Sequence, residues 1–193
     1  MVEPAGENIS YTYEDLLTWP EEERWELIDG VPYDMTPAPS LRHQDILGRL
    51  YRQFGDFLDG APCRVILAPF DVRLPKASES WLTTTTVVQP DLTVICEREK
   101  LDDHGYVGAP TLVVEILSSY TSPKDLRVKL QLYERVGVKE YWVVYPGEKV
   151  IQIYTLNEHG RYDAPAIAVV DDQLPVGVLP GLVIDLARVF AEV

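Results

Sequence analysis

The residues best suited to chemistry are two carboxylates that lie in apolar segments. Asp91 follows Pro90 at the start of the segment DLTVI, and Glu115 interrupts the apolar run TLVVEIL. Burying an unpaired carboxylate costs several kcal/mol, so Glu115 needs a partner inside the fold. Two carboxylates that converge from adjacent strands form a hard-oxygen site of the kind that Mg²⁺ or Mn²⁺ prefers. A metal ion would therefore offset the cost of burying Glu115.

A lysine in the segment after Glu115 is placed to join these carboxylates. Asp125, Lys129 and Tyr133 are spaced by four residues, so a helix would carry all three on one face. Lys129 would reach the carboxylates from the edge of the buried face, where its charge could orient a water nucleophile or neutralise a phosphoryl group. Taken singly, Asp91 is typical of a turn, Glu115 of a structural ion pair and Lys129 of a solvated helix position. Their combination favours a site.

The hydrophobic pattern predicts the elements that position these side chains. The β-branched run around Glu115 is typical of a central strand that is covered on both faces. A helix is expected from Ser122 and Pro123 to Gly137, because proline is favoured in a first helical turn. The other expected elements are a capped helix at Thr12, a hairpin with its turn at Asp29 and Gly30, a helix over 41–58, strands over 63–75, 87–96, 139–146 and 149–156, a polar loop over 98–106, and a final helix from Asp185.

Strands before and after a central helix predict an α/β fold with a mixed sheet flanked by helices. A chain of 193 residues is long enough for one substantial core and short for two, so we expect a single domain over residues 1–193. Tyr133, Tyr141 and Trp142 lie beside apolar residues and are expected in the core. Cys63 and Cys96 lack the spacing of a zinc site, and we expect them to be packing residues without a disulfide.

The composition limits where the protein acts and what it binds. No apolar run approaches the roughly 20 residues that span a bilayer, and the N-terminus lacks the apolar core of a signal peptide. We therefore expect a cytoplasmic protein that does not enter membranes. The formal net charge of −14 disfavours a protein that coats nucleic acid, but it permits an enzyme that meets phosphates at one local site.

Several short motifs occur together in the order and spacing of a known family. The motifs WELIDG, QPDLTVI, VVEILSS, D…K…Y and GVKEYWVV resemble the Uma2-like family, also called DUF820, and the resemblance covers the chain roughly from Tyr11 to Tyr154. These are restriction-endonuclease-like proteins of the PD-(D/E)XK nuclease superfamily. The resemblance implies a restriction-endonuclease-like mixed α/β core and a divalent-metal site for phosphodiester hydrolysis.

The resemblance also implies roles for individual residues. Asp91 matches the aspartate of the PD motif, and Glu115 matches the second acidic residue of (D/E)XK. The lysine of that motif would fall at Leu117, but Uma2-like sequences carry it on the next helix, where Lys129 matches. Glu26, in WELIDG, matches a further acidic position that completes the metal site. An exposed position on the hairpin is the alternative for Glu26.

Three other positions bear on the expected site. The backbone carbonyl of Ile116 is expected to contribute to the metal site. His43 matches a histidine common in the family, but its helix is rich in arginine, which favours a solvated histidine. Ser119 stands where the family usually has proline, which implies a looser loop before the predicted helix.

The sequence therefore predicts a metal-dependent endonuclease that hydrolyses nucleic acid, with DNA as the first choice of substrate. Asp91, Glu115 and Lys129 are the predicted catalytic residues. Mg²⁺ is the predicted cofactor, with Mn²⁺ as a substitute. Two alternatives stay open: a catalytically inert binding module with a nuclease fold, and a hydrolase of small phosphate esters. A homodimer is also considered, because related nucleases often use two sites to address two strands.

Overall fold

The structure, a computed structural model, describes residues 9–20, 23–35, 38–118 and 123–191, and in the helix that begins at residue 123 it describes side chains from residue 126 onward. Its main sheet is mixed and has six strands in the order β12-β11-β10-β9-β6-β3. Strands β9 and β10 are parallel, and the other neighbours are antiparallel. The strands are β3 (Arg64–Leu67), β6 (Leu92–Ile95), β9 (Leu112–Ile116), β10 (Glu140–Tyr145), β11 (Val150–Thr155) and β12 (Ala166–Val169).

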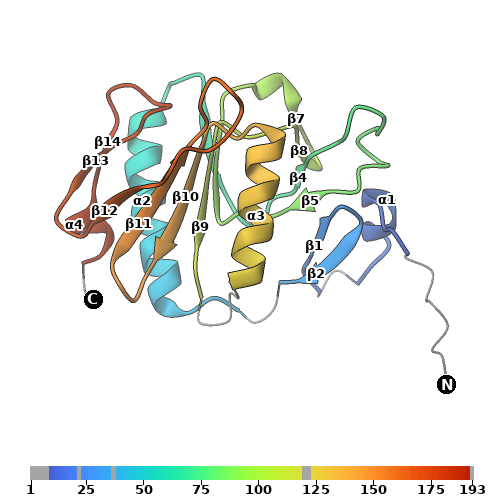
Figure 1. The fold of residues 1–193 in the computed structure, drawn as a ribbon, viewed down its shortest axis with the longest axis horizontal. Helices are drawn as coiled ribbons and strands as arrows, with labels where there is room; N and C mark the ends of the chain where they lie inside the picture. Colours follow the sequence, from blue (N-terminus) through green and yellow to red (C-terminus); the bar gives the residue numbers. More distant parts are fainter. Residues whose placement is uncertain (1–8, 21–22, 36–37, 119–122, 192–193) are drawn as a thin grey trace.

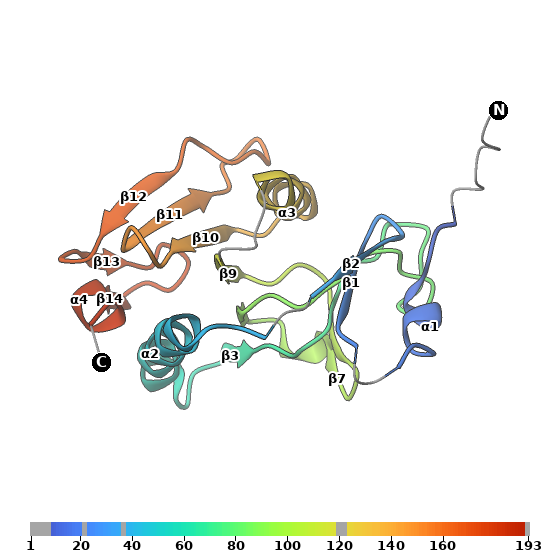
Figure 2. The same ribbon diagram turned by 90° about the horizontal axis from the view of Figure 1, so that it is seen from below.

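Two long helices, α2 (Leu41–Leu58) and α3 (Pro123–Val136), cover opposite faces of this sheet (Figures 1 and 2). Alternate residues of a strand point to opposite faces. On β9, Leu112 and Val114 accordingly join the core beneath α2, whereas Val113 joins the core beneath α3. Glu115 shares the register of Val113 and therefore points toward α3. The predicted mixed α/β fold with flanking helices is confirmed.

A second six-stranded sheet has the order β2-β1-β5-β4-β8-β7. The remaining described elements are short. The strands of this sheet are β1 (Trp25–Ile28), β2 (Val31–Asp34), β4 (Val72–Arg73), β5 (Val87–Val88), β7 (Leu101–Asp102) and β8 (Gly105–Val107); beyond it lie α1 (Tyr13–Leu16), the 3₁₀ turn η1 (Arg98–Lys100), the strand pair β13 (Gln173–Pro175) and β14 (Val183–Asp185), and α4 (Leu186–Val189).

Helix α2 has the bounds that its apolar spacing predicts. Its N-cap Ser40 accepts a hydrogen bond from the backbone N–H of His43, which satisfies one of the free donors of the first turn. A stripe of apolar residues at helical spacing packs onto the sheet. Its buried members are Ile46, Leu47, Leu50, Phe54 and Leu58.

The hairpin turn is also where the sequence predicts it. Asp29 and Gly30 both adopt positive φ angles, of 52° and 79°, as a two-residue hairpin turn with right-handed twist requires. A Cβ atom on Gly30 would lie 2.0 Å from the Ser10 hydroxyl oxygen, so this position also needs glycine for space. The predicted caps at Thr12 and Asp185 and the predicted start of α3 at Pro123 are confirmed.

Four expectations about local structure are wrong. The segment 63–75 divides into β3 and β4, which lie in different sheets, with a cis peptide bond between Ala68 and Pro69 in the connection. The segment 87–96 likewise divides into β5 and β6 around Gln89 and Pro90. The polar loop over 98–106 contains η1 and the β7–β8 hairpin.

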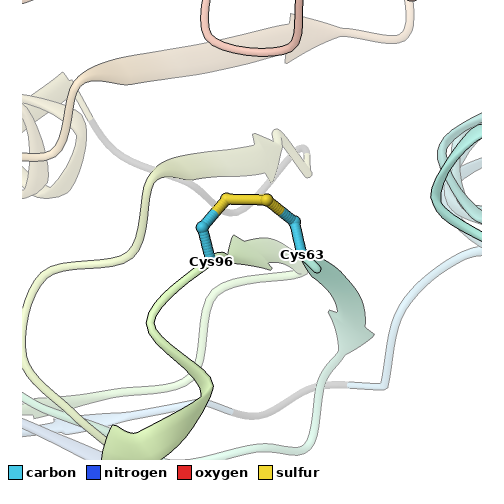
Figure 3. Close-up of a disulfide and its surroundings, with 2 residues drawn as sticks. All are labelled: Cys63 and Cys96. Carbon is cyan, nitrogen blue, oxygen red and sulfur yellow. A yellow bond between two sulfur atoms is a disulfide. The ribbon is translucent and has the colours of Figure 1, made fainter. Parts of the chain in front are cut away.

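The fourth wrong expectation concerns the cysteines. Cys63 and Cys96 form a disulfide between the segments that carry β3 and β6 (Figure 3). These two strands are antiparallel neighbours, and the Arg64–Ile95 pair lies directly beside the bond. Spacing along the sequence could not show the pairing, because the register of two distant strands brings the two thiols together.

Within the described part of the chain, no helix combines the length and the apolar character needed to cross a membrane.

Candidate active site

Glu115 lies at the centre of a cluster of charged side chains at the end of β9. Its Oε1 atom accepts two hydrogen bonds from α3: one from Lys129 Nζ at 2.9 Å and one from the Tyr133 hydroxyl at 2.8 Å. The Glu115 side chain is 12% exposed. The helix thus supplies the partner that a carboxylate in an apolar strand requires.

Lys129 also connects this carboxylate to the second sheet. Its Nζ donates to Glu26 Oε1 at 3.0 Å, and the backbone N–H of Gln89 donates to the same oxygen at 2.8 Å. Glu26 is 2% exposed, which rules out the alternative of an exposed hairpin position. Lys129 therefore reaches the site as predicted, and it lies between two glutamates from different sheets.

Asp91 faces the cluster from the strand next to β9. The β6–β9 register pairs Leu92 with Val114, so Asp91 and Glu115 occupy facing positions on adjacent antiparallel strands. Asp91 Oδ2 accepts a hydrogen bond from the backbone N–H of Ile116 at 2.7 Å. The places of the two carboxylates in apolar segments predicted that they converge, and this register gives Asp91 and Glu115 facing backbone positions.

His43 lies on the other side of Asp91. Its Nε2 is 3.2 Å from Asp91 Oδ2, and the residue is 7% exposed. The expectation of a solvated histidine is wrong, because His43 shares the buried face of α2 with Ile46, Leu47 and Leu50. The arginines of α2 occupy other faces of the helix. The prediction was wrong because it used the composition of the whole helix and not the face on which His43 lies.

The cluster carries more negative than positive charge, which perturbs its titration. Burial raises the pKa of Glu115 to about 7; Lys129 opposes this shift, and the charges of Asp91 and Glu26 add to it. Burial would lower the pKa of Lys129, but Glu115 and Glu26 raise it above its usual value, so the ammonium stays charged. The pKa of His43 is raised above its usual value. Burial alone would lower this pKa, but the hydrogen bond to Asp91 and the negative charge of Asp91 outweigh the effect of burial.

Each carboxylate of the cluster has one oxygen engaged by the protein. The engaged atoms are Glu115 Oε1, Glu26 Oε1 and Asp91 Oδ2. For residues 9–20, 23–35, 38–118 and 123–191, no donor from the protein reaches the second oxygen of any of the three. Carboxylate oxygens are the donors that a hard divalent cation prefers, so the chemistry of the set fits such an ion.

The positions of these carboxylates, unlike their chemistry, do not suit a metal ion without rearrangement. Among the described residues, no group of three or more His, Cys, Asp or Glu side chains is gathered closely enough to hold a metal ion as it stands. The cation that lies between Glu26 and Glu115 is the ammonium of Lys129. A metal-bound state would therefore need rearrangement within the cluster, and Asp91 and Glu115 are the pair with facing positions.

Two contributors to the cluster were not predicted from the sequence. Tyr133 was expected in the core, and it is fully buried, but its hydroxyl also contacts Glu115. Its spacing of four residues from Lys129 was the available signal. Gln89 contributes a backbone N–H, which no residue pattern reveals. Ser119 and the Asp125 side chain lie outside the described part of the structure, so the expectations for them have no structural counterpart.

A mixed sheet between two helices, with carboxylates and a lysine gathered at the end of a central strand, is the core that the resemblance to restriction-endonuclease-like proteins implies. The chain belongs to the Uma2 family: the family model described as "Putative restriction endonuclease" matches residues 13–187. The resemblance inferred from the motifs is thereby confirmed.

Two individual proteins are also similar to this chain. An uncharacterized protein of Synechocystis sp. is 29% identical over 152 residues, which are 77% of this chain and 76% of the relative. The crystal structure of a putative nuclease belonging to DUF820 from Anabaena variabilis superposes with a TM-score of 0.74. It covers 94% of this chain and 98% of its own, at 19% identity, which establishes a shared fold.

Proposed function

We propose that this Uma2-family protein is a metal-dependent endonuclease that hydrolyses phosphodiester bonds in nucleic acid, with DNA as the substrate tested first. The observation that carries the proposal is the facing pair of carboxylates, Asp91 and Glu115, on adjacent strands beside the charged Lys129. Membership of a family whose model is described as "Putative restriction endonuclease" supports it. Each carboxylate of the pair keeps one oxygen that the described protein donors do not engage.

Asp91 and Glu115 would hold Mg²⁺, or Mn²⁺ in its place, with Glu26 and the carbonyl of Ile116 as further ligands. When bound, such an ion lowers the pKa of a coordinated water and stabilises negative charge on the phosphate. Glu26 would join the ion only after rearrangement, because its Oε1 is hydrogen-bonded to Lys129 and to the backbone of Gln89.

The protein's own residues supply the remaining functions. Lys129 stays charged and is held within 3.0 Å of two carboxylates, so it can orient a water molecule or stabilise charge that develops on the phosphoryl group. His43 and the Ile116 N–H both engage Asp91 Oδ2, which limits the rotation of that carboxylate and holds its other oxygen in one direction.

Nicking of supercoiled plasmid in the presence of Mg²⁺ or Mn²⁺ tests the proposal. We expect the wild-type protein to nick, and we expect Glu115→Gln and Asp91→Asn to lose at least about a hundredfold in rate, because each removes a charged metal ligand. Asp56→Asn is the matched control, since Asp56 is exposed on α2 and the change is chemically the same. Undiminished nicking by Glu115→Gln would refute the assignment.

One observation favours the alternative of an inert binding module. The ammonium of Lys129 already neutralises Glu26 and Glu115, so the cluster is paired internally without a metal ion. The same plasmid distinguishes the two functions. In the presence of Mg²⁺, an inert module would bind the plasmid and slow its migration in a gel-shift experiment, but it would leave the plasmid supercoiled.

A further inference from the structure

Tyr133 is the donor to Glu115 that the proposed chemistry leaves without a role. It lies one helical turn after Lys129, is fully buried, and donates its hydroxyl hydrogen to Glu115 Oε1 at 2.8 Å. Lys129 donates to the same oxygen at 2.9 Å. A buried tyrosine hydroxyl usually finds a hydrogen-bond partner, so this contact could serve the site or only the core.

The surroundings of Tyr133 hold its ring in place. Its ring centroid lies 4.8 Å from that of Tyr141 on β10, and Tyr141 in turn stacks on Tyr154 at 5.9 Å. Tyr162 contacts both Tyr141 and Tyr154. A phenol packed against a ring that two other rings hold in place has few alternative positions, in contrast to the flexible four-carbon chain of a lysine.

A neighbouring tyrosine shows that burial alone does not produce such a contact. Tyr141 is also fully buried, yet its hydroxyl has no hydrogen-bond partner among the described residues. The two tyrosines share one packed cluster, and the hydroxyl of Tyr133 is the one directed at a carboxylate of the site. The pair therefore provides a comparison in which burial and ring packing are shared and the contact with Glu115 differs.

We propose that Tyr133 is a positioning residue that fixes the orientation of the Glu115 carboxylate during the reaction. With Oε1 held by a rigid donor, Oε2 keeps one direction, which is the direction available to a metal ion. Lys129 can then exchange its contact with Glu115 for one with the phosphate, because Tyr133 still holds the carboxylate. The inference rests on the proposed nuclease function and assigns a second donor to the same site.

The test compares Tyr133→Phe with Tyr141→Phe in the full-length protein. Each change removes one buried hydroxyl from the same cluster. For Tyr133→Phe we expect Mn²⁺ affinity, measured by calorimetry, to fall about tenfold, and kcat for plasmid nicking to fall at least tenfold at an unchanged KM. For Tyr141→Phe we expect all three quantities to stay within about twofold of wild type. Replacement of Tyr133 by 4-aminophenylalanine, which keeps a donor at the same position, is expected to restore nicking.

The outcomes separate this inference from the function on which it rests. If the wild-type protein nicks and Tyr133→Phe behaves like Tyr141→Phe, the positioning role is refuted while the nuclease function stands. If the folded 4-aminophenylalanine variant fails to nick, the donor is not what matters and the role is likewise refuted. If the wild-type protein neither binds Mn²⁺ nor nicks, the proposed function fails and the positioning role fails with it.

Discussion

At the scale of single residues, Lys129 makes two buried glutamates compatible with the fold. Its ammonium is the shared partner of Glu26 and Glu115, and Asp91 lies beside them on the next strand. Buried charges are tolerated when they are paired and hydrogen-bonded, although such pairs seldom add net stability. A cluster of this kind is better explained by function than by stability, since hydrophobic residues would stabilise the strand end at least as well.

The raised pKa of Glu115 predicts how the stability of the folded protein depends on pH. Its pKa is about 7 in the folded protein and near 4.5 when exposed, so between these values the folded state binds more protons than the unfolded state. The free energy of unfolding should therefore fall as the pH rises through this window. Glu115→Gln cannot ionise and should become the more stable protein above pH 7 without metal, by about 3 kcal/mol, since one pKa unit corresponds to about 1.4 kcal/mol.

Urea unfolding of both proteins in EDTA, at intervals from pH 5 to pH 8, measures this difference. The gap in favour of Glu115→Gln should widen from pH 5 to about pH 7 and level off above it. A gap that stays constant across the range would mean that Glu115 does not titrate in this window.

Part of the site could be predicted from residue types alone, and part could not. Asp91 and Glu115 stand out because carboxylates in apolar segments need an explanation, and Lys129 follows from helical spacing. Glu26 and His43 were identified only through family resemblance, and their burial depends on packing between distant elements that no local pattern encodes.

At the scale of elements, the register of β6 and β9 does most to build the site. It places Asp91 opposite Glu115, and α2 and α3 then approach from opposite faces with His43 and Lys129 (Figure 2). Both helices were predicted correctly because apolar spacing, Pro123 and a terminal glycine mark them locally. The strand segments 63–75 and 87–96 were predicted as continuous because their apolar pattern hides the point where the chain passes from one sheet to the other.

Helix α2 should be held to the sheet mainly by its apolar stripe. Phe54 is fully buried, with its ring 5.6 Å from that of Trp142 on β10. Phe54→Ala should lower the free energy of unfolding by about 3–5 kcal/mol, as expected for a large cavity in a packed core. Phe57→Ala is the matched control, because Phe57 lies on the same helix with 41% of its surface exposed, and it should change stability by less than about 1 kcal/mol.

Chemical denaturation followed by tryptophan fluorescence compares the two variants directly, since Trp142 lies against Phe54. Equal losses in both variants would show that the core does not extend along α2 as the structure describes.

At the scale of the whole molecule, the site joins the two sheets. Glu26 belongs to β1 of the second sheet and Glu115 belongs to β9 of the main sheet. Lys129 contacts both glutamates. The formal net charge of −14 repels nucleic acid over most of the surface. A divalent cation at the cluster would reduce this repulsion where the proposed substrate would approach, so the proposed function predicts that metal binding and substrate binding are coupled.

Calorimetric titration of the full-length protein and of Glu115→Gln with Mn²⁺ at pH 7.5 tests most directly whether this cluster is a metal site. We predict that the wild-type protein binds Mn²⁺ and that Glu115→Gln binds it at least about tenfold more weakly. Equal binding by the two proteins would place any metal ion elsewhere, and a wild-type protein that binds no Mn²⁺ would leave Glu115 as the partner of Lys129 in a structural ion pair.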